Sequence, residues 1–518
     1  MLAAVPRSTR ASWMRRFGAR WGLRALLAVV GLGAWQIAVS VAHLGFLVLP
    51  EPASAIGDGL RQLGRSSFWS MVGITAELTI VAAVAGVLVG GVAGIALWKA
   101  GNVGRGIESV LVAWYATPTI IFYPIVLVLL GLNSWPIIVI GIPIAAVPSA
   151  LGMLHALRAT GPRFERISRS LCLGGFTKYR KVVLPAALPV ALPQIRVAIL
   201  FCALGVIAVQ FVDGSSGIGY GISQAYQRFD ATAMWGLVLD TLAGMVILNA
   251  LLTALFRRRA EVGRAPREGR PARRDRVVRH TALGATVLAA IGLWALLSLT
   301  TSTIASPAAA VSQLADKAGA SLGTAVLSTV EALAVGFALA VIFGTVVGYI
   351  MGRSQVLQDA YGSLLAACFT VPTVVIYPLF LGIFGVGETA KFVIAGISAF
   401  FPIAIITSES IANVDPVLSK VAESLHCSRW QAARKVIVPA VLPQVLGGIR
   451  IGFGVAFIAV VVSEMFTSNY GLGVQALTYY NQQEYGAMYG MIVLIIAIAL
   501  IGTGLLVGLE GRLERRYE

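Results

Sequence analysis

Histidine and cysteine are scarce in this chain, which holds only four of each among its 518 residues. They are His43, His155, His280 and His426, and Cys172, Cys202, Cys368 and Cys427. The cysteines form no C-x-x-C pair and the histidines are not clustered, so neither a metal-ligand set nor a nucleophile with its base can be assembled from them. We therefore expect no metal site and no catalytic residues, which argues against a membrane-bound enzyme.

Charged residues are scarce as well. Only 12% of the residues are Asp, Glu, Lys or Arg, whereas 58% are hydrophobic and the mean hydropathy is +0.84. A soluble domain of this size could not bury so much apolar surface. Almost uncharged runs recur along the chain, each long enough or nearly so to cross ~30 Å of hydrocarbon as a helix. They predict an all-α polytopic membrane protein with twelve transmembrane helices, at 25–48, 72–98, 107–131, 134–157, 190–212, 231–256, 280–300, 324–351, 361–385, 389–413, 443–465 and 487–509.

Acidic residues number 23 against 40 basic ones, which gives a net charge of +17. Much of this excess lies in 1–24, with six Arg and no acid, and in 257–280, with ten Arg and three acids. Aromatic residues are not interleaved with these cations, so we expect no nucleic-acid partner. Both segments flank hydrophobic runs, where the membrane potential and anionic lipid retain Arg on the cytoplasmic side. Membrane lipid is thus an expected partner, and both termini are expected in the cytoplasm.

The chain repeats itself at an offset of 254 residues, without a gap from Glu77/Glu331 to Gly219/Gly473. Because six spans per copy leave both copies in one orientation, we expect two parallel six-helix repeats with a shared pathway at their interface. The predicted divisions are a basic cytoplasmic N-terminus (1–24), a first repeat (25–256), an Arg-rich cytoplasmic linker (257–280), a second repeat (281–510) and a cytoplasmic tail (511–518).

One basic segment is repeated with particular clarity, as RKVVLPAALP at 180–189 and RKVIVPAVLP at 434–443. It lies between the fourth and fifth predicted spans of each repeat. Before it in the second repeat, Leu418, Val421, Ala422 and Leu425 recur at helical spacing and predict a short amphipathic helix. Ser428 to Gln431 then has the S-x-x-Q form of a capping box, which predicts a second helix after a sharp turn. Together they predict a helix–turn–helix on the cytoplasmic face, continuous with a span.

This doubled segment resembles the EAA loop of ABC-importer permeases, whose pattern is E-A-A, three residues, G, nine residues, then I-x-L-P. The glutamate position is occupied by Arg166 and Lys420, and the glycine position by Cys172 and His426, so the charge is inverted in both copies. The resemblance implies coupling to ATPase subunits, with acidic residues on the partner. The candidate coupling residues are Arg166, Ser170, Leu171, Cys172, Gly174, Phe176, Lys181 and Pro185, and Lys420, Ser424, Leu425, His426, Ser428, Trp430, Lys435 and Pro439.

Further stretches are similar to the nitrate/sulfonate/taurine branch of these permeases. They are FLVLPEPASAI, PTIIFYP, PTVVIYPLFLGIFGVGETAK and SEMFTSNYGLGV. The likeness implies the type I importer permease fold, with two permease units fused in one chain. It also implies two separate cytoplasmic ATPase subunits that drive alternating access, and an extracytoplasmic substrate-binding protein. Because the chain has no G-x-x-x-x-G-K-[ST] loop, we expect no cofactor on it, and ATP and Mg²⁺ on the partner subunits.

Polar residues within or beside the spans are candidates for the translocation pathway, because a charge there is costly. They are Glu77, Tyr123, Gln210, Asp213, Glu331, Tyr377 and Glu464. For each of them, an interhelical hydrogen bond, an interfacial position or simple packing is the alternative. Arg196 and Arg450 either attract an anion or lie near the cytoplasmic interface.

Two other classes of transporter remain as alternatives. A secondary transporter can also have two parallel six-helix halves, but its usual basic loop after the second span is missing here. An ABC exporter or a lipid-handling permease would need an ATPase but no binding protein. The resemblance implies import of a small polar or anionic solute, and the sequence does not name that solute.

Overall fold

The computed structural model describes most of the chain from residue 49 onward, together with a few positions near the N-terminus. The described residues are 29, 31–33, 35–37, 39–40, 49–115, 119–131, 133–170, 175–213, 216–257, 273–301, 303–317, 319–369, 373–385, 387–414, 417–418, 424, 426–467 and 470–517. The N-terminal segment 1–24, most of the predicted span 25–48 and linker residues 258–272 lie outside them.

The described residues form helices and connecting turns, with no strand among them. Helices satisfy every backbone hydrogen bond within one segment, which is what a hydrocarbon environment requires. Among the described residues, eight helices are long and apolar enough to cross a membrane. Their bounds are α3 Ser66–Lys99, α6 Trp135–Ser170, α8 Leu184–Asp213, α10 Ala231–Arg257, α13 Ala320–Gly352, α16 Glu388–Ala412, α19 Val438–Thr467 and α21 Tyr485–Tyr517. The all-helical membrane fold expected from composition is confirmed.

The third predicted span of each repeat contains more than one described element. In the first repeat it consists of α4 (Gly101–Tyr115), the 3₁₀ turn η1 (Thr119–Phe122) and α5 (Tyr123–Leu130). In the second it consists of α14 (Gln355–Phe369) and α15 (Thr373–Phe384). Pro124 occupies the first turn of α5, where its missing N–H costs nothing and its fixed φ favours a helix start. Within the described part of the run 107–131, the backbone therefore changes from a 3₁₀ turn to an α-helix at Tyr123.

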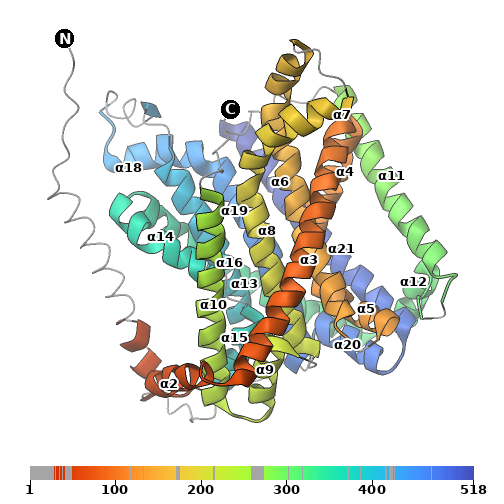
Figure 1. The fold of residues 1–518 in the computed structure, drawn as a ribbon, viewed down its shortest axis with the longest axis vertical. Coiled ribbons are helices and arrows are strands. Elements are labelled where there is room, and N and C mark those ends of the chain that lie inside the picture. The colour runs from red at the N-terminus through yellow and green to blue at the C-terminus, as the bar shows by residue number, and fades with distance from the viewer. Residues whose placement is uncertain are drawn as a thin grey trace.

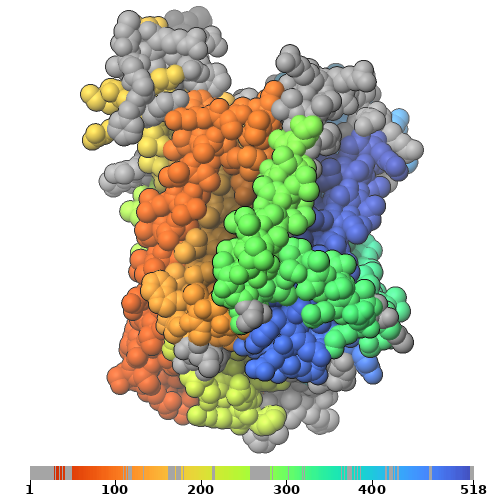
Figure 2. Space-filling view, turned by 90° about the vertical axis from the view of Figure 1, so that its right-hand side faces the viewer, coloured from red at the N-terminus to blue at the C-terminus, as the bar shows by residue number. Residues whose placement is uncertain are grey.

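Helix α11 (Arg273–Leu297) begins inside the segment 257–280 that the sequence predicts as linker. Arg is a good helix former, and its long side chain reaches water from the end of an apolar helix, so the helix continues past the apolar run. Helix α11 packs against α4 of the first repeat. Figure 2 shows α11 lying between the first repeat and α21.

The sequence repeat is also a repeat of structure. Four pairs of short elements recur at the offset of 254 residues, to within one residue at each end. They are α2 (Pro52–Gln62) and α12 (Pro307–Asp316), α9 (Gly217–Gln227) and α20 (Leu472–Asn481), α7 (Gly175–Lys178) and α18 (Arg429–Ala432), and the π-helical turns η2 (Tyr179–Val183) and η3 (Ala433–Ile437). In Figure 1, α7 and α18 lie at the upper end of the bundle and α2, α9 and α20 at the lower end. The two repeats therefore have the same orientation.

Glycines allow the second and fourth spans of each repeat to approach closely. A Cβ on Gly94 of α3 would lie 2.6 Å from the carbonyl oxygen of Ala150 on α6. The equivalent Gly348 of α13 would meet the carbonyl oxygen of Ala404 on α16 at the same distance. Small residues at helix contacts are typical of membrane proteins, where close packing rather than the hydrophobic effect holds helices together.

Elements of the third spans join the two repeats. Ile121 of η1 belongs to the core cluster of the second repeat, together with Phe457 and Val460 of α19. In the other direction, Ile376 of α15 packs against the core cluster of the first repeat. The interface is therefore built by reciprocal insertion of these short elements, as a pseudo-twofold arrangement requires.

Candidate coupling segments and buried polar bridges

The predicted capping box of the second repeat is confirmed. The backbone N–H of Gln431 donates to Ser428 Oγ over 3.3 Å, and the backbone N–H of Ser428 donates to Gln431 Oε1 over 2.9 Å. This reciprocal pair starts α18, with Ser428 exposed. The sharp turn predicted before it is present at His426, whose φ of +49° lies in the left-handed region.

His426 occupies the position at which the EAA pattern has glycine. A residue with a Cβ pays a steric cost in the left-handed conformation, and glycine does not. We expect His426→Gly to stabilise the turn by up to about 1 kcal/mol. The measurement is hydrogen exchange of the Ser428–Ala432 amides, which should slow. His426→Ala keeps the Cβ and is expected to give no gain; slower exchange in this control instead would contradict the strain argument.

Helices α7 and α18 each continue through a π-helical turn directly into the helix of the fifth predicted span, α8 or α19. Pro185 and Pro439 follow these turns by two residues. Proline donates no hydrogen bond and its ring crowds the preceding turn, which favours the wider π geometry. Lys181 and Lys435 are exposed on the turns, whereas Val183 is buried against α6. A force on either short helix would therefore be transmitted to α8 or α19.

The structure places the other candidate coupling residues near these segments where it describes them. Arg166 and Ser170 lie in the last turns of α6, Phe176 in α7 and Trp430 in α18, and Ser424 is exposed. Leu171, Cys172, Gly174, Lys420 and Leu425 lie outside the described residues, as do Val421 and Ala422 of the predicted amphipathic helix, while Leu418 is helical.

Glu464 forms a buried polar bridge in the second repeat. The carboxylate is 0% exposed and accepts from Thr329 Oγ1 of α13 over 2.8 Å and from the backbone N–H of Gly473 over 3.0 Å. The second contact places a negative charge at the N-terminus of α20, where the helix dipole favours it. Thr329 Oγ1 also accepts from the backbone N–H of Leu472 at 3.0 Å. Glu464 thus joins α13, α19 and α20.

Gln210 forms the equivalent bridge in the first repeat. Its Oε1 accepts from Thr75 Oγ1 over 2.9 Å and from the backbone N–H of Gly219 over 3.4 Å, and Thr75 Oγ1 accepts from the backbone N–H of Ile218. The side chain is 0% exposed. Gln210 and Glu464 are therefore interhelical hydrogen-bonding groups in this conformation. Asp213 is the last residue of α8.

The remaining pathway candidates have different surroundings. Tyr123 and Tyr377 are buried in the clusters at the junction of the repeats, and Val462 of the second repeat packs in the cluster of Tyr123. Glu77 and Glu331 are exposed, at equivalent positions of α3 and α13. The apolar stretch between Glu77 and Lys99 is long enough to cross ~30 Å of hydrocarbon, so Glu77 lies at one boundary of the membrane. We infer an interfacial position for both glutamates.

Arg196 and Arg450 each contact the last helix of their repeat. Arg196 donates to Thr253 Oγ1 of α10 over 2.9 Å, and Arg450 forms an ion pair with Glu510 of α21 at 3.3 Å. Both partners lie toward the ends of α10 and α21 that we assign to the cytoplasm. These contacts support the interfacial interpretation of the two arginines.

Lys391 is a functional candidate that the sequence argument missed. It is 1% exposed and lies 3.8 Å from Glu464. A single cation inside the predicted span 389–413 was the available signal.

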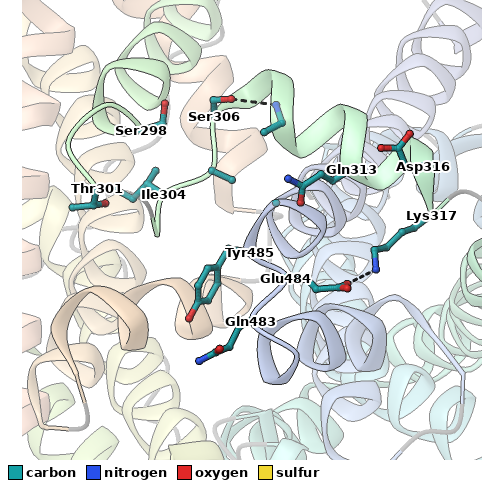
Figure 3. Close-up of a pocket in the computed structure, with 13 residues that line it drawn as sticks. Ser298, Thr301, Ile304, Ser306, Gln313, Asp316, Lys317, Gln483, Glu484 and Tyr485 are labelled. Carbon is teal, nitrogen blue, oxygen red and sulfur yellow. Dashed lines mark hydrogen bonds and ion pairs between the residues drawn. The ribbon is translucent and has the colours of Figure 1, made fainter.

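A polar pocket of about 670 Å³ opens at the lower end of the second repeat (Figure 3). Gln313 and Lys317 of the α12 region face Glu484 and Tyr485 at the start of α21 across it, and an ion pair joins Lys317 to Glu484. The residues at the corresponding end of α2, Gln62 and Leu63, are uncharged, so the first repeat has no counterpart of this ion pair. Within the described residues, no group of three or more His, Cys, Asp or Glu side chains could hold a metal ion.

Comparison with known proteins yields matches to both repeats. The family model of the binding-protein-dependent transport system inner membrane component matches residues 86–261 and again residues 340–518. A nitrate import permease protein of Synechococcus elongatus is 30% identical over 194 residues, which cover 37% of this chain and 70% of the relative. A putative aliphatic sulfonates transport permease protein of Bacillus subtilis is 33% identical over 169 residues (33% and 60%). A taurine transport system permease protein of Escherichia coli is 33% identical over 177 residues (34% and 63%). The chain thus spans less than two thirds of the length of the last two relatives.

Proposed function

Since this chain belongs to the binding-protein-dependent transport system inner membrane component family, as two fused permease units, we propose that it forms the complete translocation pathway of an ATP-driven importer. The observation that carries the proposal is the pair of cytoplasmic segments. Both lie at the same end of the bundle, and each continues through a π-helical turn into a long helix of the pathway. One chain therefore presents the two docking points that a pair of ATPase subunits needs.

The mechanism follows from this connection. Two separate ATPase subunits bind ATP and Mg²⁺ and approach each other, carrying α7 and α18 with them. Helices α8 and α19 move with these segments and shift the interface at which η1, α5 and α15 insert. The pathway then opens toward the side of α9 and α20, where a substrate-binding protein delivers solute. That side is extracytoplasmic because the basic segments, including both termini, are assigned to the opposite side.

The solute is proposed to be small and either polar or anionic. The relatives named above are permeases for nitrate, aliphatic sulfonates and taurine. The first repeat and the second repeat differ in their buried groups, Gln210 and Glu464, so the two halves of the pathway are chemically unequal.

Gentle purification from native membranes through a C-terminal tag tests the proposal. We expect two ATPase subunits for each chain, and ATP-dependent uptake after reconstitution into liposomes with a binding protein. If the chain is recovered alone and carries solute on an ion gradient without ATP, it is a secondary transporter. If the purified complex moves solute or lipid outward without a binding protein, the direction of transport is wrong.

A further inference from the structure

Lys391 is the centre of a charged cluster that only the second repeat contains. Its Nζ donates to the backbone oxygen of Tyr470 over 2.6 Å, to Ser328 Oγ over 2.7 Å and to Glu388 Oε1 over 2.9 Å. It also lies 3.8 Å from Glu464 Oε1. These contacts use all three hydrogens of an ammonium group that is almost completely buried.

The cluster connects four parts of the second repeat at its outer end. Ser328 lies on α13, Glu388 on α16, and Glu464 on α19, while Tyr470 lies in the connection between α19 and α20. Opening this connection would leave the ammonium group or the Glu464 carboxylate buried without its partners. A buried charge that loses its partner destabilises a fold far more than the loss of a neutral hydrogen bond does. The connection is therefore held much more firmly than a neutral hydrogen bond would hold it.

The first repeat has none of these charges. At the positions 254 residues earlier, Ile137 replaces Lys391, Ser134 replaces Glu388 and Ile74 replaces Ser328. Only the neutral bridge of Gln210 with Thr75 and Gly219 remains. Moreover, Gln210 Nε2 is buried and makes no hydrogen bond. The first repeat thus has only a neutral hydrogen-bonded bridge at the place where the second has a charged cluster.

We propose that Lys391 is a positioning residue that holds α20 and the preceding Tyr470 rigid, and leaves α9 of the first repeat as the outer element that opens more readily. The consequence of this difference in rigidity for transport rests on the proposed function. In that function, α9 of the first repeat would move when the outer gate opens, and α20 of the second repeat would stay in place. The difference in local stability does not depend on that function, because the contacts are within this chain.

Hydrogen exchange of the full chain in lipid nanodiscs, without ATPase subunits, tests the proposal. We expect the amides of α20 to exchange at least about tenfold more slowly than those of α9. The variant K391I/E388S/E464Q gives the second repeat the side chains of the first at these positions. It should bring exchange in α20 to the rate of α9, while α6 and α10 keep their rates. Glu510→Gln, which removes the Arg450 ion pair at the other end of the same repeat, is the matched control and should leave α20 unchanged.

A spectroscopic measurement separates local positioning from a general loss of stability. Arg228 and Gln482 are exposed equivalents at the ends of α9 and α20. A nitroxide on Gln482 should be less mobile than one on Arg228 in the unaltered chain, and equally mobile in the triple variant. Equal exchange of α9 and α20 in the unaltered chain would overturn the proposal even if the variant does not fold. Failure of ATPase subunits to bind would instead remove the proposed function and leave the exchange result standing.

Discussion

Replacing Gly471 by alanine is expected to leave little correctly folded protein. Gly471 has a φ of +143°, which side chains rarely adopt, and a Cβ there would coincide with the carboxylate of Glu464. The substitution must therefore displace a fully buried acid from the N-terminus of α20 and from Lys391. The left-handed strain costs roughly 1–2 kcal/mol and breaking a buried ion pair about 3–5 kcal/mol. The measurement is the thermal unfolding of the purified chain, together with its monodisperse fraction.

Glycines in open surroundings provide the control for this prediction. No atom outside its own helix lies within 4 Å of a Cβ built on Gly504 of α21. Gly504→Ala is expected to be neutral or slightly stabilising, since alanine is the better helix former. Gly217→Ala in the first repeat should also destabilise, because its φ is +91° and the Cβ would meet Gln210. If the Gly471→Ala chain unfolds at the same temperature as the Gly504→Ala control, the role assigned to the Glu464 bridge is disproved.

Reversing the charges of both cytoplasmic segments is expected to abolish ATP-driven uptake. Arg180, Lys181, Arg434 and Lys435 are all exposed, so changing them to Glu should not disturb the fold. We propose that they face acidic residues of the ATPase subunits, in keeping with the inverted charge at Arg166 and Lys420. Four reversed contacts are expected to weaken docking by at least about 100-fold. The measurement is the number of ATPase subunits that co-purify, alongside the uptake rate.

Reversing the charges of one segment at a time tests whether each segment binds its own ATPase subunit. A chain with only Arg180 and Lys181 reversed should retain one ATPase subunit on the second repeat, and uptake should still be lost because both subunits must close together. Lys99→Glu combined with Arg353→Glu changes two exposed charges at the same end of the bundle, outside the segments, and should leave docking intact. Full ATPase recovery after reversal of both segments would show that docking does not use these residues.

Local sequence signals predicted the parts of the site that depend on neighbouring residues. The S-x-x-Q pattern at Ser428 specifies a capping box whose two hydrogen bonds span only three residues, and the structure contains both. The offset of 254 residues predicted matching elements in both repeats, and the paired short helices follow it. The change from a 3₁₀ turn to an α-helix at Tyr123 was not predicted, because an apolar run shows its length but not where its helical geometry changes.

The sequence by itself determined that this is an all-helical membrane protein made of two parallel repeats, with a basic segment leading into the fifth span of each. Hydropathy, charge placement and a gapless repeat are properties of the linear chain, so no structure was needed for these conclusions. Only the tertiary structure decided which polar groups meet. Lys391 and Glu464 lie 73 positions apart in the sequence, and whether a buried charge is paired depends on distances that folding alone sets. For the same reason, only the structure distinguished the buried Glu464 from the exposed Glu77 and Glu331.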